Sequence, residues 1–270
     1  MIVLFQVLTN KRNQYLHMER INKVAEITLI FWLMKIIATT LGETLGDYLA
    51  MTLNLGYSTG LIITLVFFIV ALYIQLFTKK YIPVFYWLVI IATTTLGTEI
   101  SDFLDRSLHL GYTLGSLLLF TYLILTLFLW NKKFKNLNVY PIFDKNKEIF
   151  YWLAILFSNS LGTAFGDYLS DVIGLSFLHG AMVTTAIILI VVLLHYTTKL
   201  NRIMLFWTAF IFTRPFGATF GDFLTKPIVN GGLDLGTLNS SLVSIALITV
   251  LIIVSHRKLN KRIMEQYSVQ

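Results

Sequence analysis

The sequence predicts an all-α integral membrane protein of eight transmembrane helices, arranged as four tandem two-helix repeats in two pseudo-symmetric halves. Its composition and one repeated motif predict this fold. Hydrophobic residues make up 56% of the 270 residues and charged residues only 13%, whereas soluble globular proteins carry about 25% charged residues. A chain this apolar belongs in a lipid bilayer, which is therefore its first expected partner.

The repeated motif combines small residues with a final aspartate. Each copy ends fifteen residues after a tryptophan, and the second pair of copies follows the first at a uniform offset of 120 residues. A fixed period of this kind indicates one structural unit written four times. The copies are LGETLGD (41–47), LGTEISD (96–102), LGTAFGD (161–167) and FGATFGD (216–222), which follow Trp32, Trp87, Trp152 and Trp207.

Basic residues cluster between the predicted hairpins. Seventeen of the 21 Lys and Arg residues fall into five groups, while the opposite turns hold only Arg106 and Lys226. Each interval between groups has room for two crossings of about 20 residues and a short turn. Since basic loops are retained in the cytoplasm, both termini and the three lysine-rich loops are expected there. This placement explains the net charge of +7 without a nucleic-acid partner.

The expected spans alternate in character. Even-numbered spans are almost uninterrupted Leu, Ile, Val and Phe, and we expect them to face lipid. The spans are residues 26–53, 60–77, 82–104, 115–130, 149–169, 180–196, 203–224 and 236–254. The expected organisation is a cytoplasmic lead (1–23), a first half (24–130), a basic linker (131–147), a second half (148–254) and a basic tail (255–270).

Small residues recur in one register of the odd-numbered spans. Lipid gives helices no hydrophobic reason to associate, so small residues four apart indicate faces where two backbones approach closely. The odd-numbered helices are therefore expected to contact one another. The helix-packing residues are Gly42, Gly46, Gly97, Ser101, Gly162, Gly166, Gly217 and Gly221.

A polar stripe accompanies this small face, with Thr40, Glu43 and Asp47 on one side of the first odd span. The fourth repeat departs from the pattern at Arg214 and Pro215. Proline removes a backbone donor and predicts a kink. Arg214 is expected near the bilayer centre, where an arginine costs about 2.5 kcal/mol or more unless it is paired, so we expect an acidic partner.

Lys35 is similarly deep in the first span but has no counterpart in the other repeats. We expect its side chain to reach the membrane interface or to pair with Glu26.

Acidic residues on inner faces predict a secondary transporter, because carboxylates inside a membrane are costly and usually functional. Carboxylate and hydroxyl oxygens suit a small divalent cation of the Mn²⁺, Mg²⁺ and Ca²⁺ class, with protons as a coupling ion. The candidate binding residues are Glu43, Asp47, Glu99, Asp102, Asp167, Asp222, Arg214, Thr40 and Thr95. The candidate metal ligands among them are Glu43, Asp47, Glu99 and Asp102.

Three other interpretations remain open. A small anionic or organic substrate would bind at Arg214. A structural or partner-binding protein would use the motif aspartates only as helix ends near the far membrane boundary. Glycine followed by aspartate also resembles intramembrane aspartyl proteases, although here the motif is repeated in one context. No cofactor is expected, since the sequence has no phosphate-binding glycine loop, no metal-ligand spacing among its five histidines, and no cysteine.

Two segments carry a resemblance to a known family: GETLGDYL (42–49), and RPFGATFGDFLTKP (214–227) followed by Gly231 and Gly232. Over its eight spans the sequence is similar to bacterial multi-spanning membrane proteins defined by a repeat of unknown function. The resemblance implies the repeated fold and the bacterial cytoplasmic membrane, and it brings no established activity. Ser101 and Thr163 depart from the fullest pattern. A weaker similarity, to cation exporters with a glutamate, glycine and aspartate motif, differs in spacing.

Overall fold

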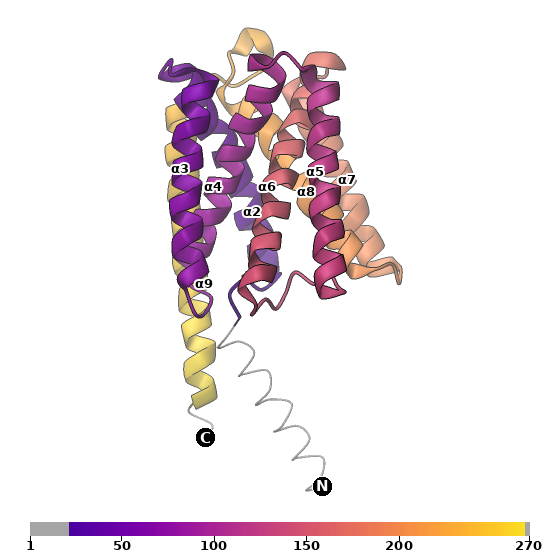
Figure 1. Cartoon of the computed structure of the whole chain (residues 1–270). Coiled ribbons are helices and arrows are strands. Elements are labelled where there is room, and N and C mark those ends of the chain that lie inside the picture. Colours follow the sequence, from indigo (N-terminus) through magenta and orange to yellow (C-terminus); the bar gives the residue numbers. More distant parts are fainter. Residues whose placement is uncertain (1–21, 268–270) are drawn as a thin grey trace, which may run out of the picture.

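Eight of the described helices are long and apolar enough to cross a membrane. The structure, a computed structural model, describes residues 22–267, so most of the lead expected at 1–23 lies outside the described residues. The helices confirm an all-helical fold with eight candidate membrane spans (Figure 1). They are α2 (Leu29–Asp47), α3 (Gly56–Phe77), α4 (Pro83–Asp102), α5 (Gly111–Phe134), α6 (Lys145–Asp167), α7 (Phe177–Thr197), α8 (Arg202–Thr225) and α9 (Thr237–Tyr267).

The helices form an inner and an outer layer. In the apolar stretches of α2, α4, α6 and α8, 61–72% of the residues are buried, against 22–28% in α3, α5, α7 and α9. The exposed residues of the outer helices are mainly Leu, Ile, Val and Phe. An outer layer of this composition suits contact with lipid chains, which offer no hydrogen-bond partners.

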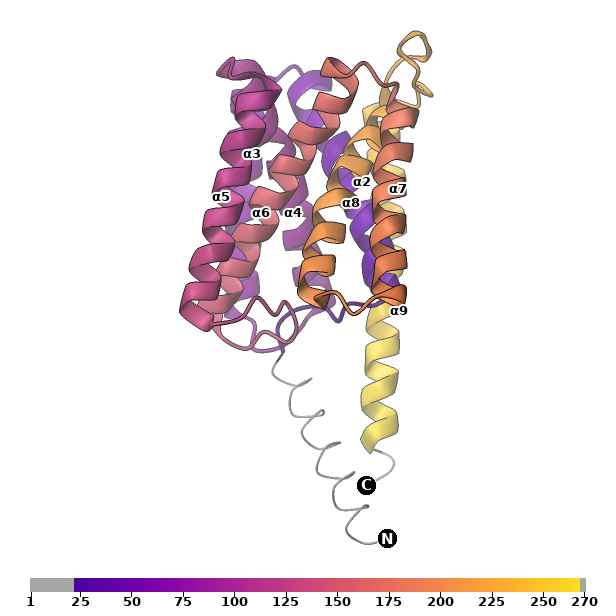
Figure 2. The same ribbon diagram turned by 90° about the vertical axis from the view of Figure 1, so that its right-hand side faces the viewer.

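The inner helices form a closed ring. Helix α2 packs against α4, α4 against α6, α6 against α8, and α8 against α2. Each outer helix packs mainly on the inner helix of the following repeat, so α3 lies on α4, α5 on α6, and α7 on α8. The last outer helix, α9, packs on α2 and closes the outer layer as well. Figures 1 and 2 show the helices running along a common axis.

Glycines allow the inner helices to approach one another closely. A Cβ atom built on Gly42 would lie 2.5 Å from the Cβ of Thr94, and one on Gly217 would lie 2.4 Å from the Thr39 hydroxyl. No side chain fits at such separations unless the helices move apart. The same register is used all round the ring: Gly42 lies on Thr94, Gly97 on Asn159 and Ser160, Gly162 on Arg214 and Pro215, and Gly217 on Thr39.

The helix ends differ in detail from the expected spans. Three inner helices end in π-helical turns, namely η1 (Tyr48–Thr52), η2 (Phe103–Ser107) and η3 (Tyr168–Val172). The loop between the halves is shorter than expected, because α5 continues to Phe134 and α6 begins at Lys145. Much of the expected basic tail is the end of α9. Despite Pro215, α8 is one uninterrupted helix.

Buried aromatic and ionic contacts close the ring at the end where the described chain begins. The indoles of Trp87 and Trp152 are almost completely buried there. Glu148 is fully buried, forms an ion pair with Lys23, and accepts a hydrogen bond of 2.9 Å from the side chain of Gln75. Packed side chains thus fill the interior of the ring at this end.

Candidate functional site

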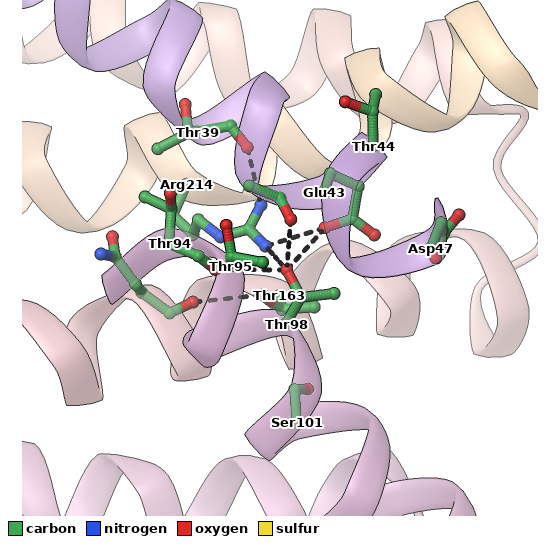
Figure 3. A network of polar contacts seen from close by, with 12 residues as sticks. Thr39, Glu43, Thr44, Asp47, Thr94, Thr95, Thr98, Ser101, Thr163 and Arg214 are labelled. Carbon is green, nitrogen blue, oxygen red and sulfur yellow. Dashed lines mark hydrogen bonds and ion pairs between the residues drawn. The ribbon is translucent and has the colours of Figure 1, made fainter. Parts of the chain in front are cut away.

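An ion pair crosses the interior of the ring halfway along the inner helices. Arg214 of α8 is fully buried, and its Nη2 lies 2.8 Å from Glu43 Oε2 of α2. The same nitrogen donates to the Thr98 hydroxyl of α4, and Nη1 donates to the Thr39 carbonyl at 3.3 Å (Figure 3). The expected acidic partner of Arg214 is thus Glu43, and one guanidinium connects three inner helices.

Lys35 also points into the ring, away from the membrane interface. Its side chain is fully buried and donates a hydrogen bond of 2.8 Å to Asn159 Oδ1. The ammonium also lies 4.1 Å from the ring centre of Phe210, a cation–π contact. The expectation of an interfacial position or a pair with Glu26 was wrong, because Asn159 of α6 supplies an acceptor inside the ring.

Two basic residues, which lie just beyond the ends of α4 and α8, join the motif aspartates in pairs. Lys226 Nζ lies 2.6 Å from Asp47 Oδ2 and 3.2 Å from Asp222 Oδ1. Arg106 lies 3.3 Å from Asp102 Oδ1 and 3.5 Å from Asp167 Oδ2. Each basic residue follows the motif aspartate of its own repeat by four positions and also reaches the aspartate of the next inner helix.

These groups surround a cavity of about 210 Å³ at the end of the ring where the inner helices terminate. Its mouth lies near Asp171 and Asn230, which are exposed. Five carboxyl groups line it against two basic groups. The lining residues are Glu43, Asp47, Arg106, Asp167, Ser170, Asp171, Phe177, Asp222, Lys226 and Asn230.

Three of these carboxyl groups are close enough to hold one metal ion. Oxygen atoms of Glu43, Asp47 and Asp222 lie within 4.8 Å of one another, and all three residues are buried. The grouping joins the first and fourth repeats, because α2 and α8 are neighbours in the ring. Carboxylate oxygens are the ligands that hard divalent cations prefer.

Two of the expected metal ligands lie outside this group. Thr98 occupies the repeat position that Glu43 has in α2, and Glu99 follows it by one residue. One residue corresponds to a rotation of about 100° around the helix axis, which turns Glu99 out of the ring. Its carboxylate faces Gly60 of α3, where a Cβ atom would lie 2.6 Å from Oε2. Asp102 pairs with Arg106 in the second repeat.

The expected threonine ligands also lie elsewhere. Thr95 donates its hydroxyl hydrogen bond to the Ile91 carbonyl of its own helix, 3.0 Å away. Neither Thr40 nor Thr95 lines the cavity. Asp167 and Asp222 do line it, as expected candidates, while Arg214 lies behind Glu43.

Arg106 and Lys226 are site residues that the sequence argument assigned only to the turns. Their signal in the sequence is the spacing of four residues from a motif aspartate, which places two side chains on the same helical face. Burial opposes the charge of the Lys226 ammonium, but Asp222 and Asp47 outweigh burial and raise the pKa of Lys226 above its ordinary value. The neighbouring carboxylates thus favour the charged form of Lys226.

Comparison with known proteins identifies the repeat. A family model described as "Repeat of Unknown Function (DUF347)" matches four times, at residues 30–81, 85–133, 150–201 and 205–258. No curated protein and no solved structure matches the chain. The four matches follow the four two-helix units of the structure and cover most of the chain. The chain therefore belongs to the family defined by this repeat of unknown function.

Proposed function

We propose that the protein is a secondary transporter of a small divalent cation of the Mn²⁺, Mg²⁺ and Ca²⁺ class. The observation that carries the proposal is the convergence of Glu43, Asp47 and Asp222 within 4.8 Å of one another on helices that are candidate membrane spans. Acidic groups in such a position are costly and usually functional.

The electrostatics of the cavity favour a cationic substrate. Five carboxyl groups line it against two basic groups. In addition, α2, α4, α6 and α8 all direct their C-terminal ends toward the motif aspartates. The negative end of each helix dipole therefore adds to the negative potential of the side chains.

Glu43 connects the cavity to the packing of the ring. It lines the cavity and also forms the ion pair with Arg214, which bonds to Thr98 of α4. A cation that binds Glu43 competes with Arg214 for the same carboxylate, so substrate binding weakens a contact among α2, α4 and α8. We propose that this competition starts the change of access, with protons on the same carboxyl groups as the coupling ion.

The orientation belongs to the same proposal. The lysine-rich loops and both termini are cytoplasmic, the cavity opens on the outer side of the bacterial cytoplasmic membrane, and the two halves act as pseudo-symmetric units. The positive-inside bias supports this orientation, and the offset of 120 residues between the halves supports their equivalence.

Other functions have less support. An anion at Arg214 would have to displace Glu43 from a fully buried guanidinium. An aspartyl protease needs two carboxyl groups that share a proton, whereas an ammonium lies between Asp47 and Asp222. A purely structural role would account for the ion pairs, but not for three carboxyl groups gathered within 4.8 Å of one another beside an open cavity.

The test is Mn²⁺ uptake into proteoliposomes that contain the purified protein and a metal-quenched dye. We expect Asp47→Asn and Asp222→Asn each to lower the initial rate at least about tenfold, since each removes a charged ligand at the substrate site. The control is Asp234→Asn, the same substitution in an exposed loop residue at the same end of the molecule, which should leave the rate unchanged. Equal rates in all three variants, or no uptake by the unmodified protein, would refute the proposal.

A further inference from the structure

We propose that Lys226 is a tethered cation that occupies the substrate site of the empty carrier and thereby selects divalent over monovalent cations. This inference rests on the proposed function. The Lys226 ammonium lies 2.6 Å from Asp47 and 3.2 Å from Asp222, and these two carboxylates form the candidate metal site together with Glu43. A metal ion in that site therefore requires the position that the ammonium now holds.

The backbone of Lys226 is fixed while its side chain retains access to water. Its amide donates to the Asp222 carbonyl at 2.8 Å, and its carbonyl accepts from the Asp234 amide at 3.0 Å. Gly232 packs so tightly that a Cβ atom there would lie 2.0 Å from the Lys226 carbonyl oxygen. The side chain nevertheless has 26% of its surface exposed. The fixed backbone and the solvent-exposed part of the side chain fit an ammonium that a metal ion displaces toward the solvent.

Charge balance explains how such a lysine selects divalent over monovalent cations. A monovalent ion that displaces the ammonium only exchanges one positive charge for another. A divalent ion adds one net positive charge to a cavity whose carboxyl groups outnumber its basic groups. Only the divalent ion therefore gains electrostatic energy from the exchange.

Arg106 provides a matched comparison inside the same cavity. It precedes Lys226 by the repeat offset of 120 residues, lines the cavity, and bridges Asp102 and Asp167. Its two carboxylates are not part of the group formed by Glu43, Asp47 and Asp222. Neutralising Arg106 changes the total charge of the cavity as much as neutralising Lys226 does, but it leaves the candidate metal site occupied.

The experiment measures Mn²⁺ binding to the purified full-length protein by calorimetry, with NaCl or N-methyl-D-glucamine chloride at equal ionic strength. We expect Lys226→Met to bind Mn²⁺ roughly tenfold more tightly than the unmodified protein, because a competing charge in direct contact with the ligands is removed. Its binding should also become sensitive to Na⁺. Arg106→Met and Lys226→Arg should keep the unmodified protein's resistance to Na⁺.

Three results would overturn the inference. Equal gains in Mn²⁺ affinity in Lys226→Met and Arg106→Met would show that removing either positive charge strengthens binding through the overall field of the cavity. Lys226 would then not compete with the metal ion for its site. Loss of Mn²⁺ binding in a folded Lys226→Met protein, with retention in Lys226→Arg, would show that Lys226 organises the site. Failure of the unmodified protein and of every variant to bind Mn²⁺ would reject the proposed function itself, and this outcome differs from the other two.

Discussion

Arg214 stands in the fourth repeat where the other repeats have Thr39, Thr94 and Asn159. Its depth in the span showed that it needs an acidic partner, but the sequence offered Glu43, Glu99 and four aspartates. The ring order excludes the acids of α4, because α8 lies next to α2 and α6, and the ion pair is formed with Glu43 of α2. The Thr98 contact was beyond prediction for the same reason, since it depends on α4 lying on the other side of α2.

Neutralising one partner of this ion pair should destabilise the protein more than neutralising both. Breaking a buried pair typically costs about 3–5 kcal/mol, because a charge remains buried without compensation. We expect Arg214→Gln and Glu43→Gln each to lower the thermal unfolding midpoint in detergent clearly. The double variant should unfold at a higher temperature than either single variant, because it leaves no unpaired buried charge. Additive losses would show that the two side chains do not interact.

Glu99 illustrates the limit of assigning sites from residue type alone. The sequence shows an acid deep in a span, and the cost of burying it suggested an ion ligand. In the repeat, Glu99 aligns with Thr44 and Thr98 aligns with Glu43, so the carboxyl groups of Glu43 and Glu99 lie on different faces of their helices. Neither oxygen of the buried Glu99 carboxyl group has a hydrogen-bond partner among the described residues.

At the scale of elements, close packing of the inner helices depends on their glycines. The spacing of small residues predicted which face of each odd-numbered span is involved, and the structure places that face against the next inner helix. The π-helical turns and the continuity of α8 through Pro215 were not predictable. Near Pro215, the Thr39 hydroxyl of α2 donates to the Thr213 carbonyl at 3.2 Å, a contact with a neighbouring helix that the sequence does not specify.

Gly42→Ala should separate α2 from α4. The added Cβ would lie 2.5 Å from the Thr94 side chain and 2.8 Å from its backbone carbon, which cannot move away independently. Overpacking of this kind typically costs about 1–3 kcal/mol, and we expect a lower thermal unfolding midpoint. Gly166→Ala is the matched control, since its Cβ would meet its nearest neighbour, Ala218 Cβ, at 3.1 Å. An equal loss in both variants would contradict this account of the contact between α2 and α4.

At the scale of the whole molecule, hydropathy and the repeat were enough to predict eight spans in four units. They did not predict that each outer helix leaves its own repeat and packs on the next inner helix. Every unit carries the same pattern, so sequence alone does not distinguish packing within a repeat from packing between repeats. The pairing of Lys226 with Asp47 follows from the same closure, since it joins the last repeat to the first.

The proposed orientation can be tested because the chain contains no cysteine. We expect a single cysteine at Val229, which is 92% exposed in the loop between α8 and α9, to react with a membrane-impermeant maleimide in intact cells. A cysteine at Lys80, in the loop between α3 and α4, should react only after the cells are permeabilised. The opposite labelling pattern would invert the orientation, and the cavity would then open toward the cytoplasm.

Because α9 packs on α2, the set of helix contacts does not depend on which repeat comes first in the polypeptide. Three junctions between consecutive repeats are bridged by the chain, and the fourth is formed by packing alone. The described chain starts and α9 ends at the same end of the bundle (Figure 1). A circularly permuted gene that opens between Phe134 and Lys145 and links the present termini would therefore encode the same set of helix contacts in a different order.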